Sequence, residues 1–217
     1  MNGLPETIVY HGPTVSDRLR ELGLTVEGLV EAVRQGEMAA AEATRHDPPT
    51  AGGYDRWRYT VRSLRDTYCP TGEWVAREEN GLPLLESEDK ARVVIVRPGD
   101  EGVGDPSMVP RLRRAPGEAI SNRTKTNHLA QLPLSASWFN QQLPKSQGPQ
   151  TWFLMTAKKG DIIYAELSLG YGDIGPGGSP SWMERIILPT TLLGEPPPSA
   201  TQRPEAEDVD VQVSRKR

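Results

Sequence analysis

The sequence is poor in the residue types that build several classes of protein. Its 217 residues include a single cysteine, Cys69, which excludes an intramolecular disulfide. The three histidines contain no pair at metal-binding spacing. No apolar run approaches the ~18 residues that a membrane-spanning helix needs, and there is no glycine period and no sustained heptad. Disulfide-rich, membrane-spanning, collagen-like and coiled-coil proteins are therefore excluded.

Signals for export and for common cofactors are also missing. Residues 1–20 do not combine a basic start with an apolar core, so we expect no secretory signal and, with one cysteine, a cytoplasmic protein. Neither a Gly-x-Ser-x-Gly elbow nor a phosphate-binding loop occurs, so we expect no resident cofactor and no metal. Arginine outnumbers lysine 19 to 6, which is typical of a GC-rich bacterial genome.

What the sequence does contain is a moderate hydrophobic content with many turn formers. Hydrophobic residues make up 36% of the chain, which also has 21 glycines and 20 prolines. This hydrophobic share lies below the globular average of about 45–50%. We therefore expect a folded core with long irregular connections. The length supports one domain, because domains usually run roughly 100–200 residues.

The first third of the chain predicts three helices. Apolar residues recur at helical spacing in three windows, 14–22, 25–44 and 54–66. Thr25 is placed to cap the second helix, and the pair Gly52-Gly53 is expected to end it. Arg58, Arg62 and Arg65 fall on one side of the third helix, which gives that helix a cationic stripe.

The middle and later parts of the chain predict strands. Asn80-Gly81 is a strong hairpin signal between 73–77 and 82–85, and Pro83 indicates that the second arm is an edge strand. Residues 91–97 have the continuous apolar pattern of a central strand that is covered on both faces. Further strands are expected at 151–157, 162–169 and 182–188, the first two as an antiparallel pair.

Helices followed by a mainly antiparallel sheet are typical of an α+β fold. We expect a helical N-terminal region over 1–50, an α+β domain over 51–193 and a disordered tail over 194–217. Within the domain, residues 98–150 show little periodicity and predict a long irregular segment. Such segments are usually either functional or poorly ordered.

The most uneven property of the chain is the distribution of its cations. The chain has 25 Lys and Arg against 29 Asp and Glu, a formal net charge of −4. Residues 111–160 nevertheless hold eight Lys and Arg and one acid, Glu118, whereas the segments on either side are net negative. Asparagines, glutamines and aromatic residues are interleaved with these cations.

This combination favours nucleic-acid binding, because cations neutralise phosphates, amides read base edges and rings stack on bases. We therefore predict a non-enzymatic accessory or regulatory protein that binds an anionic partner, above all nucleic acid. The candidate contact residues are Arg58, Arg62, Arg65, Arg111, Arg113, Arg114, Arg123, Lys125 and Trp138. The alternative is a solvated loop whose arginines pair with the chain's own acids.

A metal enzyme is a second hypothesis. Asp100 and Asp105 follow the central strand, and Glu166 projects from the polar face of a neighbouring strand. Oxygen ligands in this arrangement could hold Mg²⁺ for phosphodiester cleavage. The sequence therefore leaves open whether the protein is an enzyme.

A protein-interaction module is the third hypothesis. The turn Gly23-Leu24-Thr25 joins the first two helices with the geometry of a helix-turn-helix. Glu27 and Glu31 would face DNA from the second helix and repel its phosphates. Protein docking through these helices, or through the proline-containing tail, is therefore favoured over DNA reading by this pair.

Overall fold

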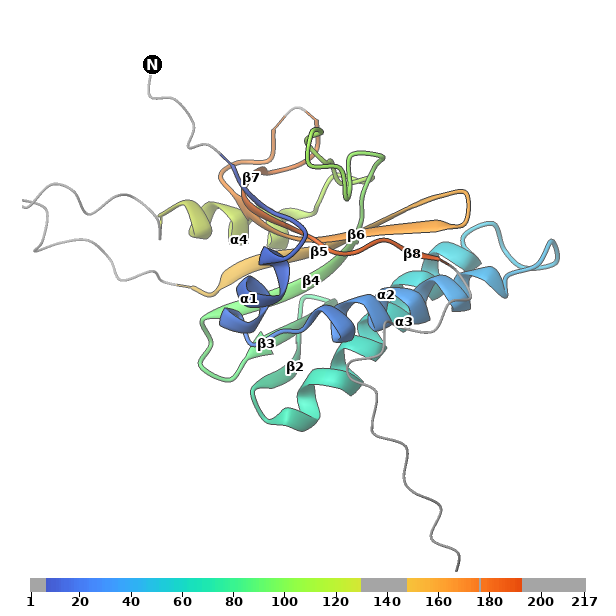
Figure 1. Ribbon diagram of the computed structural model, residues 1–217, viewed down its shortest axis with the longest axis horizontal. Helices are drawn as coiled ribbons and strands as arrows, with labels where there is room; N and C mark the ends of the chain where they lie inside the picture. The colour runs from blue at the N-terminus through green and yellow to red at the C-terminus, as the bar shows by residue number, and fades with distance from the viewer. Residues whose placement is uncertain (1–6, 130–147, 176, 193–217) are drawn as a thin grey trace, which may run out of the picture.

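The computed structural model describes residues 7–129, 148–175 and 177–192. Figure 1 shows a central sheet with helices α1, α2 and α3 on one side and helix α4 on the other. The fold is α+β, with N-terminal helices followed by a mixed, mostly antiparallel sheet, as the sequence predicts. The predicted disordered tail, 194–217, lies outside the described residues.

The N-terminal helices are α1 (Thr14–Glu21), α2 (Val26–Ala41) and α3 (Ala51–Tyr68), the last followed by a short 3-10 turn at Cys69–Thr71. Thr25 caps α2 as predicted, because its hydroxyl accepts a hydrogen bond from the Gly28 N–H at 3.1 Å. Within the part of the chain that the structure describes, no helix combines the length and the apolar character that spanning a membrane requires.

Glycines allow α2 and α3 to approach each other closely. A β-carbon at Gly36 of α2 would clash with the Thr60 hydroxyl and the Arg56 carbonyl oxygen of α3. The pair Gly52-Gly53, predicted to end a helix, instead lies in the first turn of α3. The physical reason is the same close approach, because a β-carbon at Gly52 would lie 3.1 Å from the carbonyl oxygen of Ala40.

The sheet of the described chain has eight strands in the order β1-β7-β6-β5-β4-β3-β2, with β8 paired to β6. They are β1 (Ile8–Tyr10), β2 (Trp74–Glu79), β3 (Leu82–Ser87), β4 (Arg92–Pro98), β5 (Gln150–Lys159), β6 (Ile162–Tyr171), β7 (Ser181–Ile187) and β8 (Thr191–Leu192). Strands β5 and β6 form the predicted antiparallel pair. The pairs β4–β5 and β1–β7 are parallel.

The hairpin of β2 and β3 turns at Asn80 and Gly81, as predicted. Their φ angles of 51° and 76° are both positive, which a type I′ turn requires. The prediction that Pro83 marks an edge strand is wrong, since β3 lies between β2 and β4. Strand β3 pairs with β4 only at Leu85 and Glu86, so Pro83 stays clear of that ladder and its missing N–H costs no hydrogen bond there.

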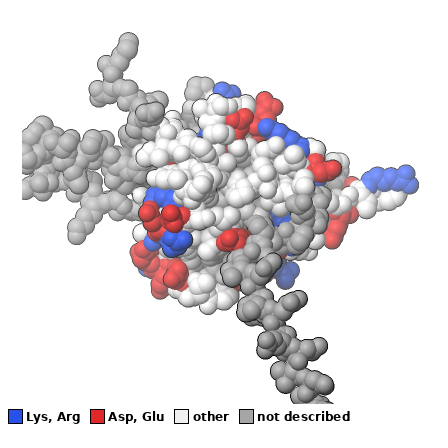
Figure 2. Space-filling model, in the orientation of Figure 1, with Lys and Arg blue, Asp and Glu red and all other residues white. Residues whose placement is uncertain are grey.

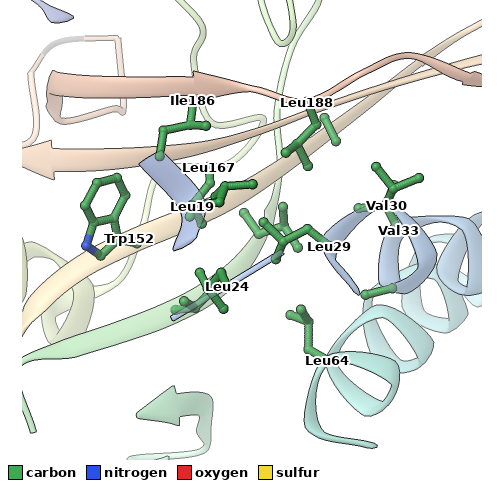
Figure 3. Packing of buried hydrophobic residues seen from close by; sticks show 14 of the residues in the cluster. Leu19, Leu24, Leu29, Val30, Val33, Leu64, Trp152, Leu167, Ile186 and Leu188 are labelled. Atoms are coloured by element: carbon green, nitrogen blue, oxygen red, sulfur yellow. The ribbon is translucent and has the colours of Figure 1, made fainter. Parts of the chain in front are cut away.

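The main hydrophobic core lies between the sheet and helices α1 to α3. Leucines from α1, α2 and α3 pack against side chains of β5, β6 and β7, as Figure 3 shows for Leu19, Leu29, Leu64, Trp152, Leu167 and Ile186. Strand β4 contributes Val94 to this core and Val93 and Ile95 to the opposite face. Both faces of β4 are therefore buried, as predicted for a central strand.

A second core covers the other face of the sheet. Phe153 of β5 and Trp182 of β7 meet edge to face there, with ring centroids 5.5 Å apart. Ile120 of α4 and two residues of the chain after β4, Val103 and Leu112, complete the layer. The sheet is thus enclosed on both sides, and the chain that follows β4 lies over this second core.

The sequence predicts an irregular segment over 98–150, but the structure places helix α4 (Glu118–Leu129) within it. The residues of α4 that face the sheet include Ile120, Thr124 and Asn127. Two of these three are polar, so no apolar period marks the helix in the sequence. Residues 130–147 lie outside the described residues.

The amide of Asn127 ties α4 to the sheet. It donates to the Thr151 and Gly170 carbonyl oxygens at 3.2 and 2.6 Å and accepts from the Thr151 N–H at 3.0 Å.

Asn127→Ala is expected to lower the free energy of unfolding by about 2 kcal/mol, since three buried backbone groups lose their partner. Urea unfolding measures this loss. Lys125→Ala is the control on the same helix, because Lys125 and Asp173 form an exposed ion pair worth less than about 1 kcal/mol. Equal losses of unfolding free energy in the two variants would contradict the proposed role of the Asn127 hydrogen bonds.

Candidate functional site

A cleft opens where the first half of α3 passes the C-terminal end of β4. We call it the arginine cleft, because four of its lining residues are arginines. Its volume is about 590 Å³. The lining residues are Pro49, Thr50, Gly53, Tyr54, Arg56, Trp57, Thr60, Val96, Arg97, Pro98, Arg113, Arg114 and Thr156.

The floor of the cleft is free because β3 pairs with only part of β4. Strand β3 pairs with β4 at Val93 and Val94 only, so the last residues of β4 have no β3 neighbour among the described residues. The chain at 111–113 returns along this free edge. The Arg113 N–H donates to the Pro98 carbonyl oxygen at 3.0 Å, and Leu112 bridges to Gly99. These hydrogen bonds bring Arg113 and Arg114 beside Arg97.

The loop between these two chain segments, residues 99–112, is held by a buried ion pair. Arg185 of β7 and Glu166 of β6 form a bidentate pair at 2.9 and 2.6 Å, and Glu166 is fully buried. The same guanidinium donates to the carbonyl oxygens of Met108 and Asp105 at 2.6 and 3.1 Å. Glu166 also accepts from the Gly104 N–H at 2.9 Å. We call residues 99–112 the clamped loop; it is drawn in green above the sheet in Figure 1.

The other wall of the cleft is the first half of α3. The rings of Tyr54 and Trp57 have centroids 5.8 Å apart and are tilted by 46°. Tyr54 is 57% exposed, whereas Trp57 is half-buried. Arg58 lies over Tyr54 and Tyr59, with its guanidinium carbon 5.9 and 4.5 Å from the two ring centroids. Tyr54 and Trp57 therefore line the same cleft as Arg97, Arg113 and Arg114.

Arg56 is fixed by an acid behind the cleft. Its Nε and Nη2 atoms donate to the two carboxylate oxygens of Glu37 at 2.5 and 3.0 Å. Glu37 belongs to α2 and is 2% exposed, so its carboxylate is shielded from any ligand in the cleft. Arg56 therefore carries little uncompensated charge.

The other three arginines of the cleft are uncompensated within the described part of the chain. Their side chains form no ion pair or hydrogen bond there, and none of the described residues that line the cleft is an acid. Arg97 is half-buried and its Nε atom has neither solvent nor a hydrogen-bond partner. Burial, and secondarily the charge of Arg114, lowers the pKa of Arg97. The cleft is thus a site of unbalanced positive charge.

Three of the contact residues predicted from the sequence lie at this site. Arg113 and Arg114 line the cleft, and Arg58, which pairs with Asp55 at 3.3 Å, lies over Tyr54 at its border. The rest of the α3 stripe is engaged elsewhere. Arg62 lies 3.4 Å from Asp66 in an exposed ion pair, and Arg65 donates to carbonyl oxygens of the β2–β3 hairpin.

The other predicted contact residues are scattered. Arg123 pairs with Glu79, and Lys125 lies 3.1 Å from Asp173, both on the α4 side of the sheet. Arg111 is exposed and points toward Gly177, away from the cleft. Trp138 lies outside the described residues. Figure 2 agrees with this dispersion, because basic and acidic side chains are interspersed on the face shown and form no continuous basic patch.

The carboxylates of the metal-enzyme hypothesis are each committed to local structure. Asp100 accepts from the Gly102 and Arg111 N–H groups at 3.0 Å, and Asp105 accepts from the N–H and hydroxyl of Ser107. Glu166 is buried against Arg185. No group of three metal-ligating side chains occurs among the residues that the structure describes. The geometry therefore lends this hypothesis no support.

Sequence reasoning missed the members of the cleft that lie outside the basic segment. Arg56, Arg97, Tyr54 and Trp57 come from the end of a strand and the start of a helix. One signal was present: Arg97 directly follows the buried apolar run Val93–Val96 within β4, where a charged side chain is rare unless it is paired or functional. Comparisons with known protein families, with curated proteins and with solved structures found no match for this chain.

Proposed function

We propose that the protein is a non-enzymatic accessory protein that binds single-stranded nucleic acid in the arginine cleft. One observation carries this proposal. Arg97, Arg113 and Arg114 have no acidic partner in the described chain, and they line the same cavity as the rings of Tyr54 and Trp57. Guanidinium groups bind phosphates in bidentate fashion, and aromatic rings stack on bases of any sequence.

The dimensions favour a single strand over a duplex. A volume of about 590 Å³ falls within the range of small-ligand pockets, roughly 300–1,000 Å³, so it suits a few atoms of backbone and one unpaired base. The whole chain carries a formal net charge of −4, and acids accompany most cations outside the cleft. A duplex would have to approach this acidic surface, whereas a flexible strand end can enter the cleft alone.

Salt dependence and paired substitutions test the proposal. We expect a fluorescent oligo-dT to bind with log Kd changing by roughly 0.7 to 2 per tenfold change in salt, which corresponds to one to three neutralised phosphates of a single strand. Arg113→Ala with Arg114→Ala is expected to weaken binding by about tenfold or more, because hydrogen bonds to charged groups are lost. Both side chains are exposed and form no ion pair or hydrogen bond in the described chain, so the fold should persist.

A matched control removes the same charge elsewhere. Arg20 and Arg62 are exposed arginines that each pair with an acid of their own helix, Asp17 and Asp66. Arg20→Ala with Arg62→Ala should leave the affinity within about twofold of the parent protein. An equal loss in the control, or binding that does not respond to salt, would overturn the proposal. No binding to DNA or RNA homopolymers would do the same.

A further inference from the structure

The half-buried, unpaired arginine of the cleft points to a particular kind of ligand group. Arg97 is half-buried, whereas Arg113 and Arg114 are exposed. Its Nε atom is out of contact with solvent and has no hydrogen-bond partner, and unlike Arg65, Arg92 and Arg123, whose Nε atoms are also unpartnered, Arg97 makes no hydrogen bond through its other guanidinium nitrogens in the described chain. A partly desolvated cation without a counter-charge is unfavourable, and buried unpaired polar atoms are rare in folded proteins. An anion that reaches this atom would offset both costs.

The charge around Arg97 exceeds what one internal phosphate of a strand can balance. Arg97 and Arg114 line the same cavity, close enough for the charge of Arg114 to lower the pKa of Arg97, and Arg113 lines it too. An internal phosphodiester carries one negative charge. A phosphomonoester carries close to two at neutral pH, because its second pKa is about 6, and it presents three terminal oxygens. Three guanidinium groups therefore match a monoester better.

The helix that forms the opposite wall adds to the same preference. The N-terminus of α3 lines the cleft through Thr50 and Gly53. Thr50 makes no side-chain capping hydrogen bond, and no acid lies in the first turn. The positive end of the helix dipole is thus uncompensated by its own side chains and favours a doubly charged group nearby. This contribution supplements the arginines and would not define a site without them.

The rings beside the arginines distinguish a nucleotide from other phosphomonoesters. Tyr54 offers a ring that is 57% exposed, and Trp57 lies one turn of helix away along the same wall. A base attached to the terminal phosphate can stack on such a surface. A phosphorylated serine or threonine has no planar group to place there.

Resting on the proposed function, we infer that the arginine cleft recognises the phosphorylated end of a single strand, with the terminal phosphomonoester against Arg97 and Arg114 and the terminal base against Tyr54. Binding then depends on the chemistry of the strand end and little on its sequence. The protein would select strands by whether an end is phosphorylated, because internal phosphates are shared by all strands.

The test compares oligonucleotides of one sequence with different ends. Oligo-dT of ten nucleotides is prepared with a 5′-phosphate, with a 3′-phosphate or with neither, and each competes with the same fluorescent probe at fixed salt. We expect one of the two phosphorylated forms to bind roughly tenfold more tightly than the unmodified form, and the tighter one identifies the end. Equal affinities for all three would overturn the inference while leaving the proposed function standing. No binding of any of them would overturn both.

Substitution of Arg97 locates the selectivity. Arg97→Gln removes the charge but keeps a donor of similar reach, and it should reduce the preference for the phosphorylated end to less than about twofold. Because Arg97 has no partner in the described chain, the thermal unfolding temperature of the Arg97→Gln variant should not fall below that of the parent protein. If this variant fails to fold, Arg114→Ala, which is exposed, carries the same expectation. Selectivity that survives in both variants would overturn the assignment.

Two further ligands separate the sources of a phosphomonoester. A phosphoserine peptide should compete at least about tenfold more weakly than the phosphorylated oligonucleotide, since it lacks a base to stack. Tighter competition by the peptide would replace the strand-end assignment with a phosphopeptide site. Inorganic phosphate should raise the unfolding temperature more than chloride at equal ionic strength in the parent protein but not in Arg97→Gln. An equal rise in both would contradict a phosphate contact at Arg97.

Discussion

Arg185→Met is expected to lower the free energy of unfolding by roughly 3–5 kcal/mol, because it leaves the Glu166 carboxylate buried without a counter-charge. Glu166 is 0% exposed and Arg185 is 3% exposed, so water cannot replace the lost partner. The carbonyl oxygens of Met108 and Asp105 lose their donor in the same step. Urea unfolding followed by fluorescence measures the difference.

A control from the surface separates burial from charge. Arg20 and Asp17 form an ion pair at 2.8 Å with both side chains about three-quarters exposed. Arg20→Met should therefore change the unfolding free energy by less than about 1 kcal/mol. Adding Glu166→Leu to Arg185→Met should recover only part of the loss, since the loop carbonyls stay without a donor. Full recovery would mean that the loop hydrogen bonds contribute nothing.

The same substitution should loosen the clamped loop, residues 99–112. This loop continues directly into Arg113 and Arg114, so its order governs where two of the cleft arginines lie. Limited trypsin digestion should cut the Arg185→Met variant after Arg111, Arg113 or Arg114 several times faster than the parent protein. Unchanged cleavage at these bonds would show that the loop is held by other contacts.

Much of the fold could be predicted because its signals are local. Asn80-Gly81 fixes a hairpin by backbone geometry, and the run at Val93–Val96 is too apolar for any strand but a covered one. Alternation in β6 placed Ile163, Ala165 and Leu167 on one face, where the structure buries them against the helices. Each of these patterns depends on neighbours within a few residues.

The elements that could not be predicted lack such patterns. Strand β1 has three residues and β8 has two, too few for a period to appear. Each exists because a longer strand offers it a free edge, β7 for β1 and β6 for β8. Helix α4 is held by the polar Asn127 amide and not by an apolar stripe. These are tertiary causes.

The candidate site was only partly predictable for a related reason. Counting charge along the chain identified residues 111–160, but the fold distributes that segment over the clamped loop's end, α4 and β5. Arg123 and Lys125 then meet acids from distant positions, Glu79 and Asp173. Arg97 belongs to a segment of negative net charge, yet in the structure it lines the same cleft as the unpaired arginines Arg113 and Arg114. Charge density in sequence and in space are different quantities.

Arg56→Met is expected to destabilise the protein more than Glu37→Gln does, although both break the same ion pair. Glu37 is 2% exposed, whereas the Arg56 side chain is 31% exposed where it borders the cleft. Removing Arg56 leaves the Glu37 carboxylate buried between the helices without a counter-charge, which should lower the free energy of unfolding by about 3 kcal/mol. Removing the charge of Glu37 leaves a guanidinium that water in the cleft can solvate, at a cost of roughly 1 kcal/mol.

A double-mutant cycle tests this asymmetry. Glu37→Gln in the Arg56→Met background replaces the unpaired carboxylate with a neutral amide, so the double variant should be more stable than Arg56→Met alone. Equal losses in the two single variants would mean that Glu37 reaches water without its partner, through the narrow gap between α2 and α3. The close approach of Gly36, next to Glu37, to Thr60, one helical turn after Arg56, argues against such a path. The asymmetry therefore measures how well the wall of the arginine cleft seals the acid behind it.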